Sequence, residues 1–301
     1  MMTRTLRDRH ATLRGDSHES AMPPSAPVVL GLLLCACLPS IVRAQTPSPL
    51  QEWQYSSHMT LQKLFEPNLP EWQVVLGVGA QHKPLYDGAA LTRTQAGPVI
   101  NIEYKDIAFA SVGEGLGVNV LRGSHYRAGF ALCYDLGRLQ SNDVEHLRGM
   151  GNIDRSVGVK AFGSYAISKS FPLVLRADIR QYVGGADGML ADLDVYMPLP
   201  GSSSRLFMFA GPSFTVGDHL YMQRQFGVTP GQSVYSGYPA FDAHAGSDAV
   251  GFGFSATGFL TDHWLIDADA AANRLLGSAR ESPITQRRVQ HAIALTIAYS
   301  W

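Results

Sequence analysis

Hydrophobic and polar residues alternate one by one along much of the chain after Gln73. The clearest run is 289–301, where the odd positions are mostly large and apolar and the even positions are small or polar. A period of two is that of a β-strand with two different faces. The small residues on the polar face suit a crowded barrel lumen, and the apolar face suits lipid. The C-terminal run therefore predicts a barrel strand.

The same alternation, bounded by Gly, Pro, Asn and Asp, continues back to residue 73. It predicts strands at 73–82, 98–105, 107–112, 116–121, 126–136, 156–168, 171–183, 188–199, 204–217, 250–261, 264–276 and 289–301. Many approach the length of about 9–11 residues that crosses a bilayer at a tilt. Twelve strands is the first expectation. Ten is the alternative, because the two short segments 107–112 and 116–121 could form one bent strand or a rim hairpin.

The connections between these strands separate by length. Short turns at 106, 122–125, 169–170, 200–203 and 262–263 alternate with long segments at 83–97, 137–155, 218–249 and 277–288. The short connections 113–115 and 184–187 are exceptions. Short turns on one side and long loops on the other are typical of outer-membrane barrels, whereas a β-sandwich has no reason to sort its connections. We therefore predict an all-β fold, an antiparallel up-and-down transmembrane barrel over 73–301.

The N-terminal part has the composition of a secretory signal. Several Arg residues precede an apolar run at 26–42, and Val42-Arg43-Ala44 suits signal peptidase. We predict a signal peptide at 1–44 and a periplasmic segment at 45–72; Met22 is an alternative start, and lipidation of Cys37 is an alternative to an ordinary signal. No later segment has the 18 or so apolar residues of a membrane helix. The predicted location is the outer membrane of a Gram-negative bacterium.

Composition narrows the possible ligands. Charged residues make up 16% of the chain and the net charge is −1, so an electrostatic drive toward nucleic acid is absent. The ten His residues show no metal-ligand spacing, and Cys133, on an inferred inward face, has no Cys partner in the mature chain. We expect no metal and no cofactor.

Charged residues fall on the faces expected to point into the lumen: Arg176, Asp178, Arg180, Asp192, Asp194, Asp267, Asp269 and Arg274. The strands that carry Arg176 and Asp192 are hairpin neighbours, so their charges should lie close together. Either they line a selectivity constriction or they form ion pairs that fill a narrow, non-conducting lumen. The mixture of signs favours ion pairs, because buried charges are normally paired.

Catalysis has weak support. Asp218-His219 and Asp262-His263 each place an acid beside a base, but adjacent strand residues point to opposite faces, and Asp262-His263 also suits a two-residue turn. We predict a protein that is not an enzyme. The aromatic-rich segment 218–249 is predicted to be a recognition surface, a lid or a packed cap, and the sequence does not choose among them.

The last strand is also interpreted as a signal that the barrel-assembly machinery recognises. Its outward-facing residues are Ile293, Leu295, Ile297, Tyr299 and Trp301. A strand that closes the barrel must also face outer-membrane lipid, so the strand can be both an assembly signal and part of the lipid-facing surface. We expect Tyr299 and Trp301 to join an aromatic girdle at the inner interface.

Three loops resemble those of the MltA-interacting protein family, also called the MipA/OmpV family. The first resembles its opening strand and loop through Leu76-Gly77-Val78-Gly79, Pro84, Tyr86 and Gly88. The long loop resembles it through Phe226-Gly227-Val228-Thr229, Gln232-Ser233 and Ser236-Gly237. The last resembles it through Arg274-Leu275, Gly277-Ser278-Ala279 and Ser282-Pro283. The similarity runs from about residue 72 to residue 301.

This resemblance implies an outer-membrane barrel that holds a murein lytic transglycosylase and a murein synthase in one complex. Other members are described as porin-like or as adhesive surface proteins, so a channel or a surface receptor is the alternative. A periplasmic partner could contact only 45–72 and the short turns, and we expect its surface at 45–72 with turns 122–125 and 200–203. A channel instead requires a water path past the lumen charges.

Overall fold

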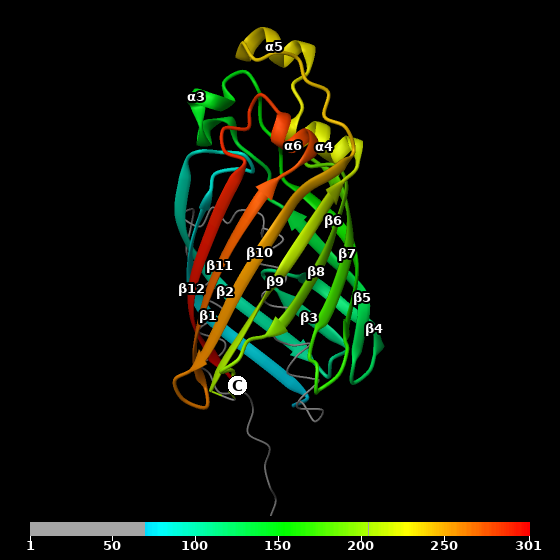
Figure 1. Cartoon of the computed structure of the whole chain (residues 1–301), viewed down its shortest axis with the longest axis vertical. Coiled ribbons are helices and arrows are strands. Elements are labelled where there is room, and N and C mark those ends of the chain that lie inside the picture. Colours follow the sequence, from blue (N-terminus) through cyan, green and yellow to red (C-terminus); the bar gives the residue numbers. More distant parts are fainter. Residues whose placement is uncertain (1–69, 204) are drawn as a thin grey trace, which may run out of the picture. The chain divides into compact units, whose positions relative to one another are not determined.

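Residues 70–203 and 205–301 are described by a computed structural model, and they form a closed antiparallel barrel of twelve strands (Figure 1). Each strand pairs with its neighbours in sequence, and β1 pairs with β12 to close the sheet. The strands are β1 (Trp72–Pro84), β2 (Thr92–Tyr104), β3 (Ala108–Ser111), β4 (Gly115–Arg122), β5 (Tyr126–Asp135), β6 (Ser156–Ala166), β7 (Val174–Gly184), β8 (Gly188–Pro198), β9 (Leu206–Gly217), β10 (Gly246–Phe259), β11 (Trp264–Leu275) and β12 (Val289–Ser300). The predicted barrel is confirmed with twelve strands, and the alternative of ten is wrong.

The predicted signal peptide at 1–44 lies outside the described residues, as does most of the predicted segment 45–72. Trp72 is already the first residue of β1. Within the described ranges, no helix combines the length and the apolar character needed to cross a membrane.

The outer surface of the barrel is apolar. In β12 the side chains of Ile293, Leu295 and Ile297 are exposed, while Thr296 and Ala298, which alternate with outward-facing residues, are buried on the lumen side. A closed sheet with lipid-compatible side chains outside and small or polar ones inside satisfies its backbone internally, as the hydrocarbon region requires. This is the architecture of outer-membrane barrel proteins.

Aromatic residues gather at the barrel end that carries the C-terminus. The rings of Tyr299 and Trp301 lie 4.5 Å apart, and Trp264 meets Tyr299 edge-on at 5.3 Å. On the neighbouring hairpin, Trp72 lies 4.5 Å from Tyr104. Amphipathic rings at this level match an interfacial girdle.

The hairpin of β3 and β4 is much shorter than its neighbours. Four residues of β2, Asn101 to Tyr104, pair with β3, and among the described residues no strand continues this pairing beyond the Ile100 carbonyl. Pro98 lies on this upper part of β2, where its missing N–H costs no ladder bond. Because the hairpin turns back early, its tip at 112–114 lies inside the length of the barrel rather than at its rim.

Two predicted boundaries are wrong. β2 begins at Thr92 instead of 98, so the long segment predicted at 83–97 shrinks to a connection at 85–91. The outward residues of this missed part are Thr92, Thr94 and Ala96, which carry no apolar alternation to reveal a strand. Likewise β10 begins at Gly246 instead of 250.

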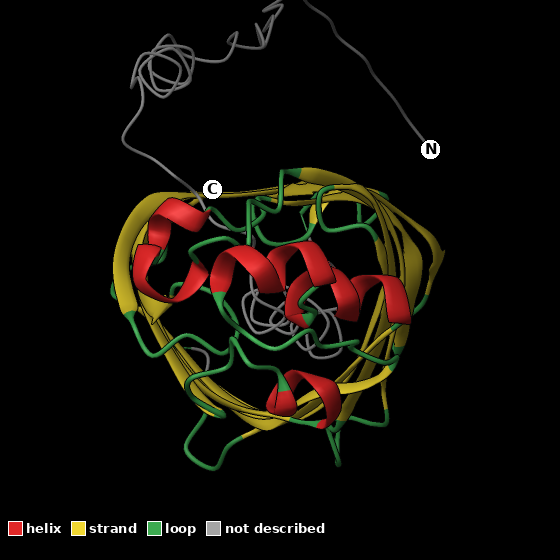
Figure 2. Cartoon of the chain, turned by 90° about the horizontal axis from the view of Figure 1, so that it is seen from above, coloured by secondary structure: helices red, strands yellow, loops and turns green. Residues whose placement is uncertain are grey.

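The long connections cover one mouth of the barrel, and Figure 2 shows their helices lying across the opening. They hold the 3-10 turn η1 (Gln140–Asn142), α3 (Val144–Leu147), α4 (His219–Phe226), α5 (Pro230–Ser236) and α6 (Gly277–Glu281). The segment predicted at 218–249 thus contains two helices. Thr229 and Gln232 form a reciprocal capping box with Pro230 at the first turn, a signal that was present in the sequence.

Candidate functional site in the barrel lumen

Six charged side chains meet on the lumen side of the wall formed by β6, β7 and β8 and the tip of the β3–β4 hairpin. We call them the charge belt, and they are Glu114, Lys160, Arg176, Asp178, Arg180 and Asp192. Alternation along each strand turns these residues inward, and the short β3 carries Glu114 to their level.

Glu114 is the anion shared by two cations. Lys160 Nζ lies 2.6 Å from Oε2, and Arg176 Nη2 lies 2.9 Å from Oε1. The guanidinium of Arg176 also lies 5.8 Å from the centre of the Phe162 ring. A carboxylate that satisfies two buried cations removes much of the free-energy cost of keeping them out of water.

The other half of the charge belt follows from the β7–β8 register, in which Asp178 is opposite Asp192. Asp178 accepts from Arg180 Nε at 3.1 Å and lies 3.7 Å from Arg176 Nε. Arg180 also pairs with Asp192, whose Oδ1 accepts the Thr215 hydroxyl at 2.5 Å.

The charge belt is closed to water. Lys160 is 0% exposed, and Arg176 and Arg180 are each 1% exposed. Side chains that line a water-filled channel remain accessible to solvent, whereas these are packed and ion-paired. The arrangement matches the ion-paired reading of the lumen charges rather than an open constriction.

Of the remaining lumen charges, Asp194 borders the charge belt, whereas Asp267 and Asp269 lie on β11. Asp267 accepts the Thr257 hydroxyl at 2.5 Å, and Asp269 lies two residues further along the same face of β11. Asp194 is opposite Arg176 in the register of β7 and β8. The expectation that Arg274 points inward is wrong: it is exposed, because it lies one residue out of phase with Asp267 and Asp269.

Sequence reasoning missed two members of the charge belt. The sequence could have placed Lys160 in the lumen, because Val157, Val159 and Ala161 of the same strand face outward and Lys160 alternates with them. No sequence pattern could have placed Glu114 there, because only the early turn of the β3–β4 hairpin brings it inside the barrel. Cys133 is buried on the inward face of β5 as expected.

The loops that resemble the family meet in one cap over the mouth. Tyr86 from the first loop donates to Asp143 at 3.4 Å and accepts from Gln286 Nε2 at 2.7 Å. Gly88, at φ 97°, offers its carbonyl to the N–H groups of Gln286 and Arg287. Segments about 200 residues apart in sequence are thereby joined.

The long loop and the last loop are joined in the same cap. Ser282 Oγ donates to the carbonyl of Phe226 at 2.5 Å, and the Phe226 side chain is buried. Val228 pairs with Phe241 and packs with Tyr86 and Ile284 in an apolar cluster. The other residues of the resemblance lie at the edges of this cap: Pro84 ends β1, Gly227 caps α4, Ser236 ends α5, Gly237 caps α5 in the left-handed region, and Pro283 follows Ser282.

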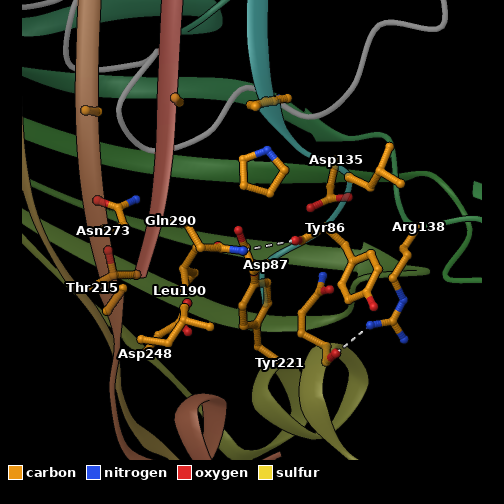
Figure 3. Close-up of a pocket in the computed structure, with 18 of the residues that line it drawn as sticks. Tyr86, Asp87, Asp135, Arg138, Leu190, Thr215, Tyr221, Asp248, Asn273 and Gln290 are labelled. Carbon is orange, nitrogen blue, oxygen red and sulfur yellow. Dashed lines mark hydrogen bonds between the residues drawn. The ribbon is translucent and has the colours of Figure 1, made fainter. Parts of the chain in front are cut away.

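Beneath α4 lies a cavity of about 150 Å³, which we call the vestibule. Figure 3 shows side chains from β5, β10, β11, β12 and α4 converging on it. Its lining includes the polar side chains of Asp87, Asp248 and Asn273 and the apolar side chains of Leu190 and Leu275. Arg180 of the charge belt also lines the vestibule.

Burial shifts the ionisation of the groups in the loops around the vestibule. Burial lowers the pKa of Arg138 to about 10, with Tyr86 and Asp87 opposing. Burial, together with Asp135 and Asp248, raises the pKa of the Tyr221 phenol. The carboxylates thus act on the same phenol from several strands.

The two acid–base pairs considered for catalysis are structural. Asp218 is the N-cap of α4, and its side chain accepts from the Tyr221 N–H at 2.8 Å. Asp262 and His263 lie in the turn between β10 and β11. Within the described residues, no group of three or more His, Cys, Asp or Glu side chains is arranged to hold a metal ion.

The barrel, its ion-paired lumen and its helical cap define an outer-membrane β-barrel protein with a covered mouth. A family model described as MltA-interacting protein MipA matches residues 76–301. The chain belongs to the MipA family.

No curated protein matches the chain. Among solved structures, the CymD monoaromatic hydrocarbon channel is 10% identical with a TM-score of 0.38, over 80% of this chain and 92% of that one. The outer membrane protein OprD of Pseudomonas aeruginosa is 10% identical with a TM-score of 0.34, over 76% of this chain and 65% of that one. The toluene transporter TbuX of Ralstonia pickettii is 11% identical with a TM-score of 0.34, over 79% of this chain and 92% of that one.

Proposed function

We propose that this chain is a non-enzymatic, non-conducting outer-membrane protein that serves as a scaffold for a murein lytic transglycosylase and a murein synthase. The observation that carries the proposal is the burial of the charge belt, because paired charges packed away from water on the lumen wall suit a rigid platform better than a conduit. The family description, which gives an interaction with MltA, supports the choice of partner.

The partner surface follows from the two ends of the barrel. The described chain begins and ends at the end with the short turns, which faces the periplasm in outer-membrane barrels. We propose the segment 45–72 with turns 122–125 and 200–203 as the contact surface. The turn between β6 and β7 adds Phe171, which is 52% exposed and offers an apolar contact.

Conductance tests the non-conducting part of the proposal. The full-length chain is refolded into a planar bilayer beside a variant that lacks residues 219–244, the removable part of the long loop between β9 and β10. Neither protein is expected to conduct, because the charge belt remains in both. Steady conductance of the intact chain would refute the proposal, and conductance of the deletion variant alone would make the loop a lid over an open lumen.

Pull-down with purified enzymes tests the scaffold part. The intact barrel is expected to retain the lytic transglycosylase and the synthase, and deletion of 45–65 is expected to release them. Phe171→Ser should weaken retention, because it removes an exposed apolar contact. The 219–244 deletion is the matched control, since it alters the opposite end. Undiminished retention after the 45–65 deletion would refute the proposed surface.

A further inference from the structure

Asp248 is a buried carboxylate without a compensating charge in the part of the chain that the structure describes. Its side chain is 6% exposed and lines the vestibule, and no hydrogen bond or ion pair joins it to a described residue. The charged group that acts on it is Asp87, which has the same sign. An isolated buried carboxylate is costly unless a proton, a partner or a ligand neutralises it.

A β-bulge aims Asp248 into the vestibule. The register of β9 and β10 shifts between Ser247 and Ala249, so Asp248 is the additional residue that pairs with nothing on β9. Its carbonyl accepts the N–H of Leu276 at 2.7 Å, which fixes the bulge against the start of α6. Bulges redirect side chains at functional sites.

A second acceptor lines the same cavity. The amide oxygen of Asn273 is buried without a hydrogen bond in the described structure, and Asn273 also lines the vestibule. Asn273 is opposite Gly251 in the register of β10 and β11. A Cβ at position 251 would collide with that oxygen, so the glycine keeps the space in which the amide lies.

The cations around the vestibule are engaged elsewhere. Arg138 Nη1 donates to the Gln225 carbonyl at 2.7 Å, and Arg180 belongs to the charge belt. Lys83 acts on Asp87 rather than on Asp248. Asp248 in its ionised form would therefore be matched by one positive charge from a ligand.

The shape and lining of the vestibule restrict the ligand further. A cavity of about 150 Å³ holds a molecule the size of benzene, which has six non-hydrogen atoms. Leu190, Leu275 and Tyr182 supply an apolar wall near the acceptors. We propose that the vestibule binds a small alkylammonium ion, whose N–H groups donate to Asp248 and Asn273 and whose short chain packs on this wall.

Calorimetric titration of the refolded full-length chain with n-butylammonium chloride tests this proposal, at pH 8 and constant ionic strength. We expect saturable binding at one site. Asp248→Asn should weaken it by about tenfold to a hundredfold, the usual effect of losing a charge-assisted hydrogen bond. n-Butanol, which has the same chain and no charge, should not bind.

Two further variants keep the test decisive. Asp269→Asn changes a carboxylate outside the vestibule lining and should leave butylammonium affinity unchanged. Asn273→Ala removes the second acceptor without touching Asp248 and should weaken binding severalfold, so the site can be tested even if Asp248→Asn fails to fold. Folding is checked by the gel mobility of the unheated protein. Absence of saturable heat, equal affinity in Asp248→Asn, or equal binding of n-butanol would overturn the proposal.

Discussion

The ion pair between Glu114 and Lys160 should be strongly coupled in a double-mutant cycle. The two side chains are 7% and 0% exposed, and Nζ lies 2.6 Å from Oε2. Removing one partner of a buried pair costs about 3–5 kcal/mol in free energy of unfolding, because the other charge stays buried. Glu114→Gln should lie near the upper end of that range, since Glu114 also serves Arg176.

Lys160→Met removes the second charge at similar length. The double variant should lose about 2 kcal/mol less free energy of unfolding than the sum of the two single losses. The reason is that neither position then holds a buried charge that has lost its partner. The free energy of unfolding is measured by urea titration of the refolded barrel, followed by Trp fluorescence and gel mobility.

The exposed pair of Glu71 and Lys105 is the matched control. Its Nζ–Oε1 distance is 2.9 Å, but its side chains are 72% and 40% exposed. Its cycle should show no measurable coupling, because solvent screens such pairs. Additive losses in the cycle of Glu114 and Lys160 would refute the reasoning that the charge belt is buried and mutually compensating.

Three other predictions test the structure elsewhere. Gly115→Ala should destabilise the barrel by more than about 1–2 kcal/mol in urea titration, because φ is 88° and a Cβ would strike the Leu132 carbonyl, whereas Gly163→Ala should be tolerated. Burial alone would raise the pKa of Asp143, but hydrogen bonds from His146 and Gln286 lower it. The cap should therefore gain stability from the ionised carboxylate above about pH 4, the unfolded value, and lose it as the pH falls toward the lowered pKa; hydrogen exchange should show this acid loosening, and Asp143→Asn should abolish it. Deleting Trp301 should reduce assembly into cellular outer membranes while detergent refolding of the purified chain stays unchanged, and equal loss in both assays would argue against an assembly signal.

Alternation was sufficient to predict the barrel because it acts residue by residue. Ile293 and Leu295 reveal their strand without any knowledge of its neighbours, and Arg176 and Arg180 reveal the inward face of β7 in the same way. Thr92 and Thr94 do not, because a strand with polar residues outside has no contrast between its faces.

The residues that complete the sites depend on interruptions of that regularity. Glu114 reaches the charge belt because β3 ends after four residues, and Asp248 reaches the vestibule because of a bulge. Both interruptions are set by pairing with distant strands. Alternation within one strand does not tell where the neighbouring strand ends.

The placement of the loops that resemble the family bears directly on how its members act. Tyr86, Phe226 and Ser282 come from three loops and meet in the cap, at the barrel end opposite Trp72 and Trp301. A periplasmic enzyme cannot reach that end of an outer-membrane barrel with the orientation expected from its short turns. The shared loop residues therefore account for the covered mouth, and the scaffold role that we propose is assigned to different residues, on 45–72 and the periplasmic turns. Exchanging those turns with another member should transfer enzyme binding, while exchanging the cap should not.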